Sequence, residues 1–236
     1  MADEEDTGPK YVFVTSAGET RKEGSRHYDG KATASYPNGD LYEGTFSAGI
    51  RDGRGCYRYA ATGDKYDGQW QQNKRHGLGT MAYNGKGEYQ GYWENNCRHG
   101  EGVFTYPSGD VYSGWWRFGN KEGTGTYYSR KSGMKMTGEW KENKVVSGNW
   151  ELNNGIRYEG LYNENKPDGE GVWVFKNGNE QRGKYAQVRG EPGEDAEGNP
   201  VPGELMLEWI PDKNIVESAL KMNRNGNVLG LTSATK

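Results

Sequence analysis

Residues Tyr66 to Tyr89 read YDGQWQQNKRHGLGTMAYNGKGEY, and variants of this stretch recur along most of the chain. The tyrosine that opens it, or a substitute for that tyrosine, falls at Tyr42, Tyr66, Tyr89, Tyr112, Met136, Tyr158 and Gln181. The steps between these positions are 22 to 24 residues, a period typical of repeat proteins. The sequence therefore predicts a tandem array of short units, each of which contacts only its neighbours.

Composition argues against a conventional globular core. Only 32% of the 236 residues are hydrophobic, a content that disordered chains share. However, the 17 Tyr, 8 Trp and 38 Gly recur periodically, and disordered chains are poor in aromatic residues. The net charge of −3 gives no global basic field, so we expect no nucleic-acid partner.

The two cysteines and the hydropathy pattern bear on the cellular compartment. Cys56 and Cys97 occupy non-equivalent places in their repeats, which argues against a disulfide framework. No signal peptide and no long apolar run stand out in the sequence. We therefore expect a soluble protein of a reducing compartment.

Each full unit is predicted to form a β-hairpin. Its first strand follows Tyr-x-Gly-x-aromatic, as in residues 66–70 (YDGQW), and its second follows Gly-x-aromatic-x-aromatic, as in residues 102–106 (GVFTY). Side chains alternate between the two faces of a strand, so the aromatic residues and the glycines share one face. Helix is disfavoured because a glycine inside a helix costs about 1 kcal/mol relative to alanine.

Glycine inside a strand normally weakens a sheet, yet here it recurs on the aromatic face of every unit. We infer that rings lie across the bare glycine backbone, an arrangement that supplies apolar burial without a second layer. The predicted fold class is therefore all-β: a single-layer, elongated, twisted antiparallel β-ribbon of tandem hairpins, stable only as an array.

The repeats divide the chain into four predicted segments. These are an N-terminal arm (1–27), the array (28–185, half a unit plus about six units), a Gly/Pro-rich linker (186–204) and a C-terminal tail (205–236). Within the arm, Tyr11 to Val14 could add a strand. Within the tail, Leu205 to Ile210 is strand-like and Asp212 to Asn223 could form an amphipathic helix.

Charged residues are expected to gather on the two long edges of the ribbon. The candidate partner-binding residues of the basic edge, in the hairpin loops, are Arg51, Arg75, Arg98 and Lys121. The turns on the opposite edge carry Asp40, Asp64, Glu88 and Asp110. Ordinary turn charge that discourages edge-to-edge pairing explains both sets without any function. The alternative hypothesis is that opposite charges on the two edges orient the ribbon against partners.

The aromatic face is a second candidate for partner binding. A single-layer sheet is expected to leave much of this face open, and large exposed apolar patches mark interaction sites. Tyr and Trp are also the preferred anchors of protein interfaces. The candidate residues are Tyr42, Tyr66, Trp70, Tyr83, Tyr89, Trp93, Phe104, Tyr106, Tyr112, Trp116, Tyr158 and Trp173.

The sequence predicts no catalytic, cofactor-binding or metal-ligating residues. His76 and His99 occupy equivalent loops one unit apart, so about 9.6 Å should separate their backbones, whereas a metal needs ligand nitrogens at about 2 Å. Gly-x-Gly pairs such as Gly77 and Gly79 are read as strand elements and not as phosphate-binding loops, which precede a helix. We therefore expect a protein that is not an enzyme and that carries no cofactor.

The quoted residues resemble the MORN repeat, whose pattern is Tyr-x-Gly-x-Trp/Phe followed by Gly-x-Gly and an aromatic residue. The resemblance covers about residues 28–185. A closer likeness is to the MORN-repeat subunits of the ciliary radial spoke head. It rests on residues 37–44 (PNGDLYEG), on the Arg-His-Gly loops 75–77 and 98–100, and on the closing segment 174–185.

This resemblance implies a scaffold protein of the ciliary or flagellar axoneme, present in the cytoplasm before assembly into this part of the cytoskeleton. It implies contacts with other radial spoke head subunits and allows a two-fold symmetric assembly. Two alternatives stay open. One is a membrane-tethering or phospholipid-binding MORN protein, which is disfavoured because stable attachment usually needs two signals and no lipidation motif is present. The other is a cytoskeletal or cell-division scaffold of a protist.

Overall fold

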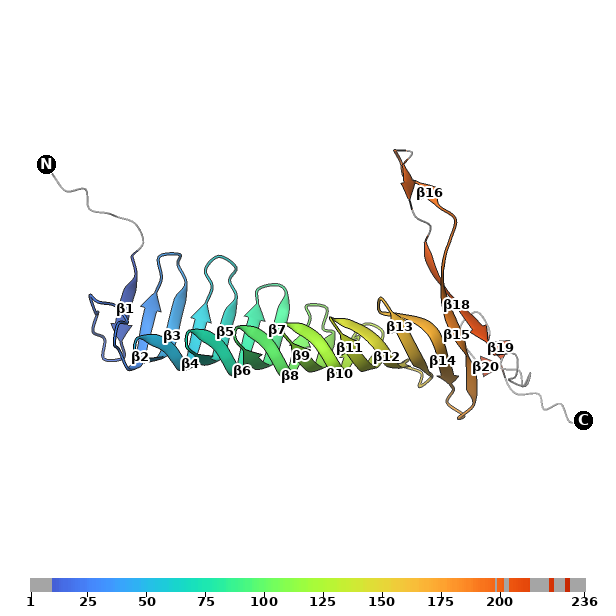
Figure 1. Cartoon of the computed structure of the whole chain (residues 1–236), viewed down its shortest axis with the longest axis horizontal. Coiled ribbons are helices and arrows are strands. Elements are labelled where there is room, and N and C mark those ends of the chain that lie inside the picture. The colour runs from blue at the N-terminus through green and yellow to red at the C-terminus, as the bar shows by residue number, and fades with distance from the viewer. Residues whose placement is uncertain (1–9, 198, 202–203, 213–220, 223–227, 230–236) are drawn as a thin grey trace, which may run out of the picture. The chain divides into compact units, whose positions relative to one another are not determined.

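The computed structural model describes residues 10–197, 199–201, 204–212, 221–222 and 228–229. These residues form strands and turns, and none of them forms a helix that could cross a membrane (Figure 1). The chain divides into two compact units, Met1–Lys144 and Val145–Lys236. Each unit is described by itself.

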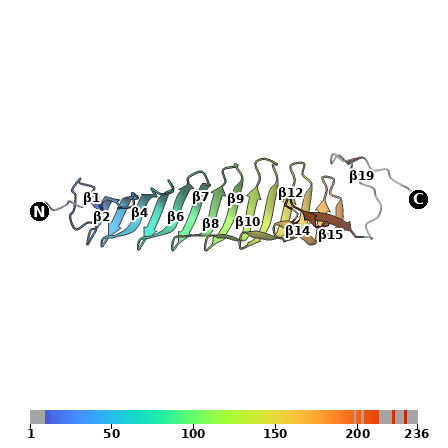
Figure 2. The ribbon, with the colours of Figure 1, turned by 90° about the horizontal axis from the view of Figure 1, so that it is seen from above.

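The first unit is an antiparallel meander in which each strand pairs with the next one in sequence (Figures 1 and 2). Its strands are β1 (Val12–Thr15), β2 (Gly30–Ser35), β3 (Leu41–Ser47), β4 (Ile50–Arg58), β5 (Lys65–Gln71), β6 (Lys74–Tyr83), β7 (Gly87–Glu94), β8 (Cys97–Thr105), β9 (Val111–Arg117), β10 (Asn120–Tyr128) and β11 (Lys135–Lys141). The strands form one layer, as predicted.

The second unit continues the hairpin pattern with fewer strands. Its strands are β12 (Lys144–Glu151), β13 (Arg157–Asn163), β14 (Lys166–Val174), β15 (Glu180–Arg189) and β18 (Leu205–Pro211), paired in that order. Two further hairpins are small. They pair β16 (Gly193–Glu194) with β17 (Pro200–Val201), and β19 (Lys221–Met222) with β20 (Val228–Leu229).

The all-β fold of tandem antiparallel hairpins is confirmed, but the sheet extends past the repeats at both ends. In the predicted arm, β1 pairs with β2, with Phe13 opposite Ala34. In the predicted tail, β18 pairs with β15 and places Trp209 opposite Tyr185. Phe13 is fully buried and Trp209 packs edge-on against Tyr158 at 6.1 Å. Residues outside the repeats therefore supply the first strand of the first unit and the last sheet strand of the second, and they cover the rings at these two ends.

The remaining segment predictions differ in detail. The stretch expected as a flexible linker contains the end of β15, β16 and β17. Within it, the Asp195 carboxylate accepts the amides of Glu197 and Asn199. The helix expected over 212–223 lies mostly outside the described residues, and its residues 221 and 222 form β19 instead.

The tyrosine that opens a repeat covers a glycine pair, as the sequence predicts. Tyr89 is fully buried, and its hydroxyl donates to the Tyr92 carbonyl at 2.9 Å. A Cβ on Gly102, across the hairpin, would meet the Tyr89 ring at 2.6 Å. The same arrangement recurs at Tyr42, Tyr66 and Tyr112. The ring lies over one glycine of its own strand and one of the next strand.

Tight loops and bulges complete each hairpin. Asn95 and Asn96 join β7 to β8 with φ of 48° and 71°, the consecutive positive values of a type I′ turn. Between Gly91 and Trp93 the register then shifts by a bulge, at which Gly100 has φ of 60°. The two-residue loop pairs Arg98 with Trp93, so the side chain of this cation lies on the aromatic face.

Candidate partner-binding surfaces

The face that carries the opening tyrosines is called the inner face, and its rings join neighbouring hairpins. Trp93 stands edge-on between Tyr66 of the preceding hairpin, at 5.3 Å, and Tyr89 of its own, at 5.2 Å. Its indole N–H donates to the Gly79 carbonyl at 3.1 Å. Trp70, Trp116 and Trp140 repeat this hydrogen bond to Gly55, Gly102 and Gly125. Each tryptophan therefore links its hairpin to the preceding one.

This packing corrects the prediction of an open aromatic face. Nine of the twelve candidate residues are only 0% to 8% exposed, namely Tyr42, Tyr66, Trp70, Tyr89, Trp93, Phe104, Tyr112, Trp116 and Tyr158. Rings of adjacent hairpins fill the space above the glycines, so a single layer covers its own aromatic face. Tyr83, Tyr106 and Trp173 are half-buried. A partner role for these three stays a prediction.

The buried tyrosines are held neutral. Burial raises the pKa of Tyr42, Tyr66, Tyr89 and Tyr112 far above its usual value, and that of Tyr158 to about 12. A neutral hydroxyl can donate to a backbone carbonyl, as the first four of these tyrosines do.

The four residues of the predicted basic edge lie over the rings of the inner face. The guanidinium carbons of Arg51, Arg75 and Arg98 are 4.6, 4.6 and 4.3 Å from the ring centroids of Trp70, Trp93 and Trp116, and the Lys121 amine is 4.9 Å from that of Trp140. The three arginines also donate to backbone carbonyls of the next loop. These cation–π contacts connect adjacent hairpins. Whether the same charges also contact a partner stays a prediction.

The series of cations that forms the basic edge (Arg51, Arg75, Arg98 and Lys121) ends within the first unit. The equivalent positions of the second unit hold Val145 and Pro167, both of which are buried. An apolar side chain there covers part of the inner face but supplies neither the cation–π contact nor the hydrogen bond to the next loop. The second unit therefore lacks one of the links that recur in the first.

Loop asparagines form another link that the sequence reasoning missed. The Asn96 side-chain oxygen accepts the Arg75 amide at 2.9 Å, while the Asn96 amide donates to the Arg75 carbonyl at 3.1 Å. Asn73 and Asn143 repeat both bonds with Arg51 and Lys121. The signal was present in the sequence, because an asparagine recurs at the second loop position in most units.

The acidic turns are also engaged within the ribbon. The Asp110 carboxylate accepts the Tyr127 hydroxyl at 2.7 Å and the Arg130 amide at 2.9 Å, and these bonds lower the pKa of Asp110. Asp40 accepts the Tyr57 hydroxyl and the Ala60 amide in the same way. Burial of Asp40 raises its pKa, but the hydrogen bonds outweigh this effect and lower it.

The opposite face, called the outer face, exposes apolar side chains that no prediction named. Trp115 is 51% exposed although its neighbour Trp116 is 3% exposed, and Tyr92 is 48% exposed beside Trp93. Leu78, the cross-strand partner of Tyr92, is 54% exposed. The signal lay in the fourth position of Tyr-x-Gly-x-aromatic, where Tyr92, Trp115 and Leu161 stand in place of the polar Thr45, Gln69 and Glu139 of the other repeats.

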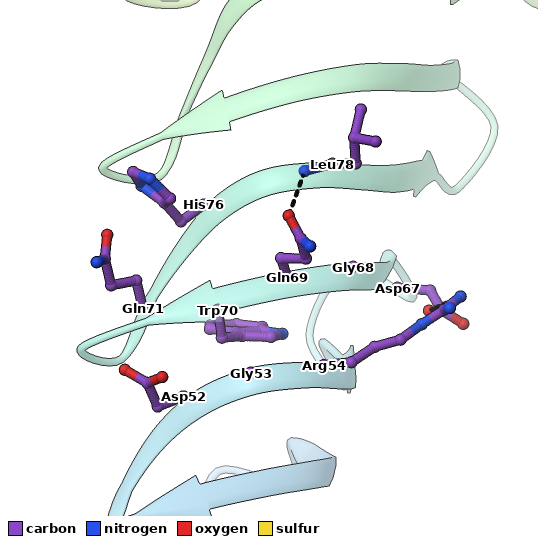
Figure 3. Close-up of a pocket in the computed structure, with 10 residues that line it drawn as sticks. All are labelled: Asp52, Gly53, Arg54, Asp67, Gly68, Gln69, Trp70, Gln71, His76 and Leu78. Atoms are coloured by element: carbon purple, nitrogen blue, oxygen red, sulfur yellow. Dashed lines mark hydrogen bonds and ion pairs between the residues drawn. The ribbon is translucent and has the colours of Figure 1, made fainter.

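A shallow groove of about 390 Å³ lies on this face between β4, β5 and β6 (Figure 3). The Gln69 side chain crosses it and accepts the Leu78 amide at 2.9 Å. Arg54 and Asp67 face each other at one end at 3.7 Å, a solvent-exposed pair that contributes little to stability. Tyr92 occupies the position of Gln69 in the next hairpin and covers the bulge there.

His76 and His99, the two loop histidines, have different surroundings. His76 lines the groove, whereas the His99 ring nitrogen lies 3.3 Å from the Glu94 carboxylate. Across the part of the chain that the structure describes, no three His, Cys, Asp or Glu side chains gather at a possible metal position. Cys56 and Cys97 are free thiols.

Comparison with known proteins agrees with the repeat pattern. The chain matches the family described as MORN repeat over residues 42–61, 66–87, 89–111, 112–134 and 158–180. Nothing among the curated proteins matches it. One similar solved structure is the SAS-4 (dCPAP) TCP domain in complex with a proline-rich motif of Ana2 (dSTIL), from Drosophila melanogaster. That similarity has a TM-score of 0.41 at 18% identity, over 65% of this chain and 83% of that one.

Proposed function

We propose that this chain, which carries five MORN repeats, is a structural interaction scaffold and a subunit of the ciliary radial spoke head. Tandem MORN repeats imply a repeat-based interaction or scaffold role and are generally found in structural or binding proteins. The finer assignment is supported by the closing segment 174–185, which departs from the generic repeat and resembles the spoke-head subunits. The proposed partners are other spoke-head subunits.

One observation carries the scaffold role. From β3 to β11, neighbouring hairpins are joined by recurring contacts, which are the tryptophan hydrogen bond, the cation over the next tryptophan and, in most loops, the asparagine pair. Recurring contacts of this kind give each hairpin the same support from its neighbours. These contacts bury most of the inner face. The outer face is therefore the surface proposed to bind other proteins.

The four cations of the basic edge do not support the phospholipid-binding alternative. Three of these cations donate to backbone carbonyls, and all four lie against rings. A lipid headgroup would have to compete with these internal contacts. Flotation of the purified chain with phosphoinositide vesicles separates this alternative, because a scaffold without lipid affinity stays in the dense fraction.

The spoke-head assignment is tested by partner identity. A tagged chain is expressed in a ciliated cell, axonemes are extracted with salt, and co-purifying proteins are identified by mass spectrometry, with an untagged cell line as the control. We expect recovery together with radial spoke head subunits. Absence from axonemes, with recovery on membranes or a basal cytoskeleton, would remove the spoke-head assignment.

A further inference from the structure

An exposed carboxylate lies between two exposed rings on the outer face of the first unit. Glu101, in β8, is directly opposite Trp115 of β9. On the other side, the Tyr92 side chain of β7 leans over Gly100, where a Cβ would lie 3.4 Å from it. Tyr92 and Trp115 are about half exposed, and Glu101 is exposed. We call these three residues, with the adjacent Leu78, the outer-face cluster.

Glu101 differs from its acidic neighbours in having no partner. Within the described residues, no hydrogen bond or ion pair involves its carboxylate. By contrast, Glu94 contacts the His99 ring at 3.3 Å, and Glu139 accepts the Thr124 hydroxyl at 2.9 Å. Its charge is therefore available to a group from outside the chain.

We propose that the outer-face cluster binds an arginine side chain in an extended segment of a partner protein. Adjacent strands are about 4.8 Å apart, so the backbones of Tyr92 and Trp115 are separated by about 9.6 Å. That gap accommodates a planar guanidinium in contact with ring faces while it forms an ion pair with the carboxylate between them. Arginine suits such a stacked site better than lysine, whose ammonium is a compact point charge.

Leu78 extends the site on the side of Tyr92. It is directly opposite Tyr92 and 54% exposed, and its strand β6 lies two strands from β8. A segment in the extended polyproline II conformation rises about 3.1 Å per residue and places every third side chain on one face, so this separation of about 9.6 Å corresponds to three residues. The partner segment is therefore expected to carry an apolar residue about three positions from its arginine.

The charge of the cluster selects among possible occupants. A free carboxylate between the rings repels an acidic peptide and an anionic membrane surface, whereas it attracts a basic segment. This inference deepens the proposed scaffold role and rests on it, but it does not depend on the location in the cilium.

The probe is a pool of fluorescein-labelled nine-residue peptides with a fixed central arginine, compared with pools whose central residue is citrulline or lysine. Binding to the full chain is measured by fluorescence anisotropy at low salt. The arginine pool is expected to bind at least about tenfold more tightly than the citrulline pool, because citrulline keeps the shape and loses the charge. The lysine pool should fall between them.

Three variants locate the site. Glu101→Gln and Trp115→Ser should each weaken binding of the arginine pool about tenfold, which corresponds to one ion pair or one cation–π contact. Glu139→Gln, which removes a different carboxylate from the same face, is the matched control and should leave binding unchanged. Circular dichroism checks that all three variants are folded.

Two results would overturn the proposal. These are equal binding of the arginine and citrulline pools, or unchanged binding in a folded Glu101→Gln variant. Either result leaves the spoke-head assignment intact, because that assignment is tested by co-purification. Conversely, a chain absent from axonemes can still bind the arginine pool.

Discussion

At the scale of single residues, glycine and tyrosine determine the interior of each hairpin. The sequence alone predicted that rings cover the glycine backbone, since both residue types recur on one face. It did not predict that the rings bury most of that face. That outcome depends on how Trp93 stands between Tyr66 and Tyr89, and packing angles of this kind are not encoded in a period.

Replacing Gly102 tests the ring packing. In Gly102→Ala, the new Cβ would clash with the Tyr89 hydroxyl and lie 2.6 Å from its ring. Tyr89 is fully buried between neighbours and cannot move aside freely. We predict a loss of about 1–3 kcal/mol in the free energy of unfolding, measured by urea denaturation.

A matched control uses a glycine without such a contact. At Gly193 an added Cβ meets nothing closer than 3.9 Å, so Gly193→Ala should change stability by only a few tenths of a kcal/mol. Equal losses in the two variants would show that Tyr89 does not pack against Gly102.

The lowered pKa of Lys121 makes the stability of the fold depend on pH. Burial and the nearby Arg98 guanidinium lower the pKa of Lys121 from 10.5 to about 8. Between these values the unfolded chain binds more protons than the folded chain, so stability rises with pH in that window. We predict that the thermal midpoint of the wild-type chain rises from about pH 7.5 to 9.5 relative to that of Lys121→Arg, whose charge does not titrate there. Parallel pH curves would contradict the lowered pKa.

At the scale of structural elements, the hairpins depend on links between neighbours. The strands could be predicted from the alternation of residues and the loops from their glycines and asparagines. The links could not be predicted from strand patterns, because they join a loop to the loop one unit away. Asn96, for example, is 21 residues from the Arg75 amide that its side chain accepts.

The asparagine link can be separated into its two parts. Asn96→Ala loses the hydrogen bond from the Arg75 amide and places alanine at a φ of 71°, so we predict a loss of about 2 kcal/mol. Asn96→Gly loses only the hydrogen bond and should cost about 1 kcal/mol. Gly119 already occupies this loop position in the next hairpin. A glycine variant less stable than the alanine variant, by chemical denaturation, would refute this account.

At the scale of the whole molecule, the two units differ in how completely their links are made. Val145 and Pro167 replace the cations in the second unit. The indole N–H of Trp150 and the hydroxyls of Tyr158 and Tyr162 are buried there without a partner among the described residues. The repeat period hid this difference, because it remains close to 23 residues through both units.

We therefore predict that the second unit opens at a lower free energy than the first. Native-state hydrogen exchange should find the amides of β13 and β14 exchanging faster than those of β5 to β9, because fewer contacts hold each hairpin. The terminal strands β1 and β18 are left out of this comparison, since strands at a sheet end also fray. Uniform protection across these strands would show that the missing links do not matter.

The central claim is that the inner face is a closed core and the outer face is the free surface. Oxidative footprinting of the purified chain tests it directly, because Trp115 and Trp116 are neighbours in sequence that face opposite ways. Trp115 is 51% exposed and Trp116 is 3% exposed, so Trp115 should be oxidised many times faster. Equal oxidation of the two indoles would contradict the closed inner face, and with it the assignment of partner binding to the outer face.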